Sequence, residues 1–274
     1  MALLHVTFTS AALKRSVPMN VILPVDGLKP AYDKPFKTLY LLHGLLGSCG
    51  DWINGTRIKR LAEAKNLAVV MPSGDNSYYV PQPGRFNDYG AFIGEELPAL
   101  TRRMFPLSDK REDTFIAGLS MGGFGAVRNG LKYPDTFGYI AGLSSSLQFW
   151  DGPPRTSISN LFDPVSCFGD MKEAEKSDKN PRTLVESLGK QADVQKPKIY
   201  LCCGTEDTLL PSNRIYRDLF QQYGYDLTYE EFPGDHTWEF WDMGIERVLN
   251  WLPLGETSDG VNSGTVMEAA KRRS

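Results

Sequence analysis

The chain has 274 residues, 41% of them hydrophobic and 23% charged, so it can bury a sizeable core. Its formal net charge of −3 argues against a surface that binds nucleic acid or an anionic membrane. No apolar run approaches membrane-spanning length, and polar residues interrupt the N-terminal segment where an export signal would be continuous. The four cysteines show no metal-ligand spacing, so we expect reduced thiols in a cytoplasmic protein.

Segments typical of β-strands recur along the chain, with helix-like segments between them. The expected strands are Leu4–Phe8, Ser16–Leu23, Thr38–Leu42, Leu67–Met71, Thr114–Ala117, Tyr139–Gly142, Lys198–Cys203 and Leu227–Phe232. The first two follow one another across a short turn, which predicts an antiparallel pair. From Thr38 onward strands and helices alternate, which predicts a mostly parallel sheet with right-handed crossovers.

The segments between the strands predict helices and one long insertion. The expected helices are Gly55–Lys65, Tyr89–Met104, Met121–Lys132, Pro211–Tyr223 and Trp238–Trp251. The stretch 148–195 is too long for a plain loop between two core strands, so we interpret it as an irregular insertion that packs over an active-site mouth. Residues 1–252 then form a single domain, and the polar residues 253–274 form a disordered tail.

The run Gly118-Leu119-Ser120-Met121-Gly122 carries the strongest functional signal. It follows an apolar strand and precedes a helix rich in Gly and Ala, which is the context of the nucleophile elbow of an α/β-hydrolase. The turn is so tight that side chains two positions before and after the serine would clash, hence glycine at both. Ser120 is therefore the candidate nucleophile.

A serine nucleophile needs a base, and the chain holds three histidines. The order in α/β-hydrolases is Ser, acid, His, and only His236 lies beyond Ser120. The acid should follow the strand between them, where Asp207 is favoured over its neighbour Glu206 because aspartate is the commoner partner. Asp235, beside the base, is expected to cap the last helix instead.

The remaining requirement is a pair of backbone N–H groups for the oxyanion. Met121 would supply one at the start of its helix, and Leu45 the other from the loop after Thr38–Leu42. Gly44 lets that loop approach the substrate closely, and His43 is expected to support the loop without transferring protons. A glycine-rich turn without this duty is the alternative.

Four segments together make the chain resemble a known family. They are His43–Gly47, Met71–Tyr78, Gly118–Gly123 and Gly204–Asp207. Over residues 1–252 the sequence resembles the esterase D family of α/β-hydrolases, within it most of all the bacterial tributyrin-esterase-like carboxylesterases. The resemblance implies a mostly parallel eight-stranded sheet flanked by helices, hydrolysis of short-chain acyl esters without metal or cofactor, and a homo-oligomer as a possible state.

The resemblance also implies that the loop 75–79 lies near the substrate pocket. Candidate pocket walls are Trp52, Tyr78, Tyr79 and Trp238, although aromatic residues beside a parallel sheet are equally well explained as core.

The leading hypothesis is a serine carboxylesterase that acts through Ser120, His236 and Asp207 and an acyl-enzyme. The alternatives are a feruloyl or acetyl-xylan esterase, which would need a roomy aromatic pocket, and an S-formylglutathione hydrolase, which would need a polar glutathione site. Acyl transfer to a sugar would require an acceptor site that outcompetes water. A binding module that has lost activity would be expected to lack a triad member, and this chain has all three.

Overall fold

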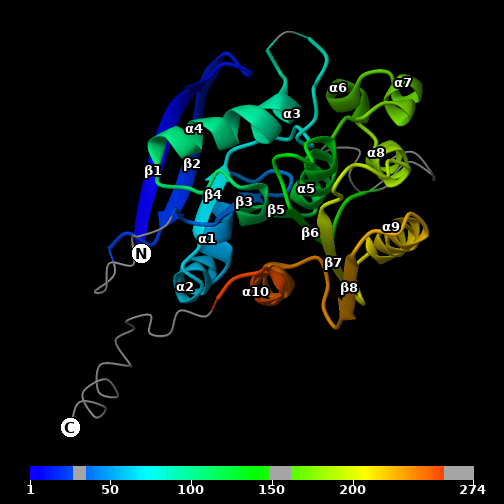
Figure 1. The fold of residues 1–274 in the computed structure, drawn as a ribbon. Helices are drawn as coiled ribbons and strands as arrows, with labels where there is room; N and C mark the ends of the chain where they lie inside the picture. The colour runs from blue at the N-terminus through cyan, green and yellow to red at the C-terminus, as the bar shows by residue number, and fades with distance from the viewer. Residues whose placement is uncertain (27–34, 85, 148–161, 256–274) are drawn as a thin grey trace.

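A computed structural model describes residues 1–26, 35–84, 86–147 and 162–255 (Figure 1). Its centre is one eight-stranded sheet with the order β1-β2-β4-β3-β5-β6-β7-β8. The strands are β1 Ala2–Ser10, β2 Arg15–Leu23, β3 Thr38–Leu42, β4 Ala68–Pro72, β5 Thr114–Leu119, β6 Tyr139–Leu143, β7 Lys198–Gly204 and β8 Leu227–Phe232. β2 pairs antiparallel with β1 and β4, and all other pairs are parallel. All eight expected strands and the predicted fold class are therefore confirmed.

Helices cover both faces of the sheet. They are α1 Asp51–Gly55, α2 Ile58–Ala64, α3 Tyr89–Ala91, the π-helix η1 Phe92–Glu96, α4 Leu97–Met104, the 3₁₀-helix η2 Arg111–Asp113, α5 Met121–Lys132, α6 Pro164–Phe168, α7 Met171–Lys176, α8 Pro181–Gly189, α9 Leu210–Gln222 and α10 Trp238–Trp251. Helices α2 and α10 lie together on one face, whereas α5 packs against α8 on the other (Figure 1).

The central strands are apolar along their whole length because both of their faces are covered. In β3, Tyr40 and Leu42 belong to the core cluster under α5, and Leu39 and Leu41 to the cluster under α10. All five β3 residues are buried. This continuous burial is what a parallel strand between two helical layers requires.

The predicted helix Gly55–Lys65 is wrong in its start, because the chain forms two helices that break at Thr56. Gly55 packs directly under the Trp238 indole, where a side chain would collide. Thr56 then adopts an extended backbone, and its hydroxyl donates back to the Trp52 carbonyl at 2.5 Å. The helix predicted over Tyr89–Met104 is helical throughout, with a π-helical turn at its centre.

The insertion expected over 148–195 is more regular than predicted. Residues 148–161 lie outside the described part of the chain, but α6, α7 and α8 follow within 164–189. Each begins after an acidic or amide residue whose side chain accepts backbone N–H groups: Asp163, Asp170 and Asn180. The single-domain boundaries stay predictions, as does the disordered tail, of which residues 256–274 lie outside the described residues.

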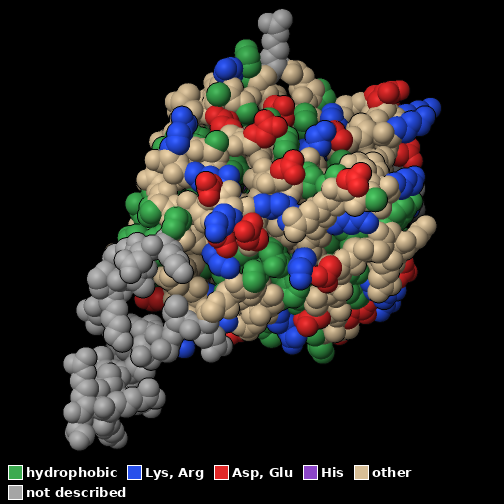
Figure 2. Space-filling model, in the orientation of Figure 1, with side chains coloured by type: hydrophobic (Ala, Val, Ile, Leu, Met, Phe, Trp, Pro, Cys, Tyr) green, Lys and Arg blue, Asp and Glu red, His purple; other side chains and the backbone are tan. Residues whose placement is uncertain are grey.

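Acidic and basic side chains are interspersed on the face drawn in Figure 2. That face therefore carries no broad field of one sign. Among the helices that the structure describes, none is long and apolar enough to cross a membrane.

Candidate active site

Ser120 occupies a strained turn between β5 and α5. Its backbone has φ 53° and ψ −115°, a combination that costs a non-glycine residue free energy. A side chain on Gly118 would collide with the Gly122 carbonyl group, and one on Gly122 would lie 2.6 Å from the His43 carbonyl oxygen. The two glycines thus allow the close crossing of strand and helix that the sequence predicts for a nucleophile elbow.

Hydrogen bonds to the strand beside it fix this turn. The Ser120 N–H donates to the Leu143 carbonyl at 2.9 Å, and the Ser146 N–H donates to the Ser120 carbonyl at 3.0 Å. The backbone around the serine is therefore held by the end of β6 as well as by its own helix.

Ser120, His236 and Asp207 form one hydrogen-bonded sequence of side chains. The His236 Nε2 atom lies 3.0 Å from Ser120 Oγ, and its Nδ1 atom lies 2.9 Å from Asp207 Oδ2. The three residues follow β5, β8 and β7, so the carboxyl ends of parallel strands bring them to one edge of the sheet. The structure brings together the three residues that sequence order selects.

Asp207 is buried yet held in its charged form. Its side chain is 0% exposed. Burial by itself would raise the pKa of this carboxyl group, but hydrogen bonds from His236 and from the Leu209 N–H outweigh it, and the net pKa is lowered. An ionised carboxylate at this position orients the imidazole with Nδ1 protonated and Nε2 free to accept a proton.

The neighbouring acids have other contacts. Glu206 is exposed, and its carboxylate accepts the Gly234 N–H and the Thr205 hydroxyl, which ties the loop of the acid to the loop of the histidine. Asp235 accepts the N–H of His236 at 2.7 Å. The expectation that Asp235 caps the last helix is wrong, because α10 begins after Thr237 and no side chain caps it.

The loop after β3 lies directly beside the nucleophile. A methyl group placed on Gly44 would lie 3.7 Å from Ser120 Cβ and 2.7 Å from Leu119 Cδ1. A side chain at this position would displace the end of the Leu119 side chain, so glycine suits the close approach. The candidate oxyanion donors, the N–H groups of Leu45 and Met121, come from this loop and from the first residue of α5. No acceptor within the described residues engages either N–H.

Three of the four candidate pocket aromatics are interior residues, since Trp52, Tyr78 and Tyr79 are each at most 1% exposed. Trp52 is 1% exposed and donates its Nε1–H to the Leu42 carbonyl at 2.9 Å. Tyr79 is 0% exposed and donates its hydroxyl to the His43 carbonyl at 3.0 Å. Their burial indicates structural roles beneath the site, so the core alternative describes them better than a pocket wall.

Tyr78 and Trp238 contact other side chains around the site. The Tyr78 hydroxyl is 3.4 Å from Ser146 Oγ, and Ser146 is hydrogen bonded to the nucleophile's backbone. The Trp238 ring is half-buried against Trp52 and Trp241. Their contact with substrate stays a prediction.

Sequence reasoning missed Trp241, which packs against the histidine. Its ring meets the His236 imidazole edge-on, with centroids 4.9 Å apart, and is 7% exposed. The signal was available, because Trp241 lies five residues after His236 and near the start of the expected helix. Among the described residues, no three His, Cys, Asp or Glu side chains gather as a metal ion would require.

Fold and site together define the class of protein: an α/β sheet that holds Ser, His and Asp in contact at its carboxyl edge is the architecture of a serine hydrolase. The model of the family described as "Putative esterase" matches residues 10–252. The chain belongs to this esterase family and is a carboxylic ester hydrolase.

Individual relatives are consistent with this assignment. The chain is 40% identical to an acetyl esterase of Caldicellulosiruptor saccharolyticus over 92% of its own length and 98% of the relative. It is 29% identical to the fluorophosphonate-binding serine hydrolase F of Staphylococcus aureus, with a TM-score of 0.81, over 92% of this chain and 98% of that one. A structure of S-formylglutathione hydrolase from the same organism gives 29% identity, the same coverage and a TM-score of 0.80.

Proposed function

We propose that this chain is a serine carboxylesterase that hydrolyses short-chain acyl esters through Ser120, His236 and Asp207. The observation that carries the proposal is the pair of contacts at 3.0 and 2.9 Å that joins the three side chains in that order. Ser120 attacks the acyl carbon while His236 Nε2 takes the hydroxyl proton, and Asp207 stabilises the imidazolium that forms. The N–H groups of Leu45 and Met121 bind the oxygen that becomes negative.

The second half of the cycle repeats the first with water. His236 gives its proton to the leaving alcohol, which departs and leaves the acyl group on Ser120 Oγ. Water then loses a proton to His236 Nε2 and attacks the acyl-enzyme, and Ser120 recovers its proton as the carboxylic acid leaves. Atoms balance at each step, and no cofactor is required.

Packing beside the nucleophile supports a small acyl group. Tyr78 lies against Phe162, Phe168 and Phe124, with ring centroids 4.5, 5.5 and 5.3 Å apart. Phe124 lies in the first turn of α5, and the Phe124 N–H donates to the Ser120 carbonyl at 3.1 Å. Aromatic side chains thus pack together on this side of α5, and we take this packing to favour a small acyl group over a long acyl chain. The relative named acetyl esterase points the same way.

An S-formylglutathione hydrolase is the second candidate, because one similar structure carries that title at 29% identity. It shares the small acyl group and differs in the leaving group, a glutathione thiol in place of an alcohol. A feruloyl esterase receives support at the level of the fold alone, since the structure titled ferulic acid esterase is 22% identical.

Two measurements test the proposal. Ser120→Ala should lower kcat for p-nitrophenyl acetate by about 10⁴-fold or more while the circular dichroism spectrum stays unchanged. Full turnover by that variant would exclude the assignment. A comparison of kcat/KM for acetyl, butyryl, octanoyl and feruloyl esters and for S-formylglutathione then separates the candidates, with acetyl esters expected to lead.

A further inference from the structure

His43 is a buried histidine with both ring nitrogens engaged. It is 1% exposed, and its Nε2 atom accepts the Gly74 N–H at 2.9 Å. A nitrogen that accepts a backbone N–H cannot carry a proton itself, so the proton of the neutral ring is on Nδ1. That Nδ1–H donates to the Gly44 carbonyl oxygen at 2.7 Å. Burial lowers the pKa of His43, which keeps the ring in this neutral form.

The Gly44 carbonyl belongs to the peptide group that carries the Leu45 N–H. Because a trans peptide is planar, its C=O and N–H bonds point in opposite directions. An anchor on the carbonyl oxygen therefore sets the direction of the N–H. Gly44 lies against Ser120, because a Cβ atom placed on Gly44 would be 3.7 Å from the serine Cβ. The Gly47 N–H also reaches this carbonyl oxygen, at the longer distance of 3.3 Å.

The loop is held from a second side by the segment after β4. Tyr79 donates its hydroxyl to the His43 carbonyl at 3.0 Å, and Asn76 Oδ1 accepts the Leu46 N–H at 2.7 Å. The ring of Tyr79 also packs edge-on against the His43 imidazole, with centroids 5.8 Å apart. The peptides on both sides of the 44–45 unit are thus fixed, and His43 is the side chain that holds the unit itself.

We propose that His43 is a positioning residue for the oxyanion site: through its Nδ1–H it holds the Gly44 carbonyl so that the Leu45 N–H points at the oxygen of the tetrahedral intermediate. This inference rests on the proposed function. The contacts of the His43 side chain are with Gly44, Gly74 and Tyr79, so its effect is on the geometry of the donor.

Two substitutions at position 43 separate positioning from packing. The side-chain amide nitrogen of His43→Asn lies at the distance of Nδ1 from the backbone, so it can still donate to the Gly44 carbonyl. The amide of His43→Gln reaches the position of Nε2, where it can accept the Gly74 N–H but leaves the Gly44 carbonyl without a side-chain donor. If His43 only held the Gly74 loop, His43→Gln would keep the higher kcat. If His43 positions the Leu45 N–H, His43→Asn keeps the higher kcat.

The experiment measures kcat and KM for p-nitrophenyl acetate in wild type and both variants, at a temperature where circular dichroism shows each to be folded. His43→Gln should lose about 100-fold in kcat with KM changed less than threefold, as the loss of one oxyanion donor predicts. His43→Asn should stay within about tenfold of wild type. Equal losses in the two variants, or wild-type kcat in His43→Gln, would overturn the proposal.

A substitute variant and a separate check of the proposed function complete the experiment. If His43→Gln does not fold, His43→Leu takes its place, since leucine offers no donor to the Gly44 carbonyl and, like asparagine, no acceptor to the Gly74 N–H. A fall in kcat at constant KM then supports the proposal, and an unchanged kcat overturns it. Failure of the proposed function is recognised separately, because wild type would then give no hydrolysis or Ser120→Ala would keep it.

Discussion

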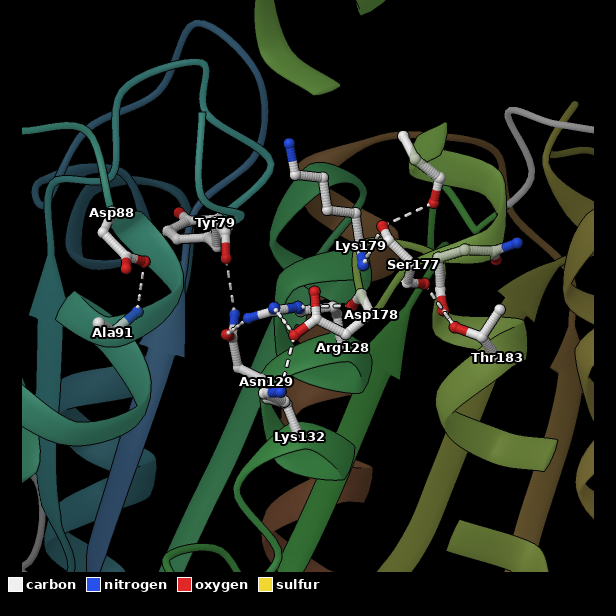
Figure 3. A network of polar contacts seen from close by, with 12 residues as sticks. Tyr79, Asp88, Ala91, Arg128, Asn129, Lys132, Ser177, Asp178, Lys179 and Thr183 are labelled. Carbon is white, nitrogen blue, oxygen red and sulfur yellow. Dashed lines mark hydrogen bonds and ion pairs between the residues drawn. The ribbon is translucent and has the colours of Figure 1, made fainter. Parts of the chain in front are cut away.

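Substituting Asp178 by alanine should expose the cost of a buried cation near the candidate site. Arg128 lies on α5, the helix that starts beside the nucleophile, and is 1% exposed. Its guanidinium contacts Asp178 Oδ2 at 3.1 Å, the Asp178 carbonyl at 2.9 Å and Asn129 Oδ1 at 2.8 Å (Figure 3). Asp178 lies between α7 and α8, so this cluster fastens the insertion to α5.

The magnitude follows from which contacts the substitution removes. Asp178→Ala deletes the carboxylate and leaves two neutral acceptors around a buried charge. Breaking a fully buried pair costs about 3–5 kcal/mol. The Asp178 side chain is 36% exposed, so water partly replaces it, and we expect a loss of about 2 kcal/mol in the free energy of unfolding.

Lys132 provides the matched control. It contacts the same carboxylate oxygen at 2.8 Å, but its side chain is 41% exposed. Lys132→Met should therefore cost less than about 1 kcal/mol. Urea unfolding at pH 7 measures both variants, and Asp178→Ala should also lower Tm by about 4–8 °C. If Asp178→Ala costs no more than Lys132→Met, the argument from the buried guanidinium is refuted.

Three further predictions concern the site itself. Asp207→Asn should lower kcat for p-nitrophenyl acetate by about 10⁴-fold because it favours the wrong imidazole tautomer; Glu206→Ala, which only loosens the tie to Gly234, should stay within about tenfold, and the reverse order would reassign the acid. Gly122→Ala should abolish activity and cost about 1–3 kcal/mol of stability, since its methyl would meet the His43 carbonyl oxygen at 2.6 Å; a wild-type Tm and kcat would contradict this. The lowered pKa of Asp207 means that its stabilising contribution is complete above about pH 4 and is lost as the pH falls through the folded-state pKa. The Tm difference between wild type and Asp207→Asn should therefore shrink on acidification, and a difference that grows would show the sign to be wrong.

The strands could be predicted because a strand that is buried on both faces has an apolar composition. A parallel strand covered on both faces must be apolar throughout, as in Thr38–Leu42 and Ala68–Pro72, and surface segments of a chain this charged seldom contain such runs. The ends of the strands then indicate where the candidate catalytic residues lie. Ser120, Asp207 and His236 each follow a strand, and the serine motif, chain order and residue type together selected the residues that the structure brings into contact. Their catalytic roles stay predictions.

The short helices were harder to predict because tertiary contacts decide them. The break between α1 and α2 depends on a tryptophan from α10 that lies against Gly55, almost two hundred residues away in sequence. The helices of the insertion did leave local signals. Asp163-Pro164 and Asn180-Pro181 each place a capping residue before a proline in the first helical turn, and Asp170 caps α7, the helix between them. The length and polarity of the segment favour an irregular loop, whereas these capping residues indicate the helices that the structure forms.

The support of the oxyanion loop shows where prediction from a pattern ends. Three of its contacts join residues thirty to thirty-six positions apart: Gly74 N–H to His43, Leu46 N–H to Asn76, and Tyr79 hydroxyl to the His43 carbonyl. Each involves a backbone group, and backbone groups are the same at every position of a sequence. A motif can therefore locate the nucleophile, whose glycines are imposed by sterics. The orientation of the N–H groups that would stabilise its oxyanion depends on which distant side chain reaches which carbonyl, and only the folded arrangement specifies that.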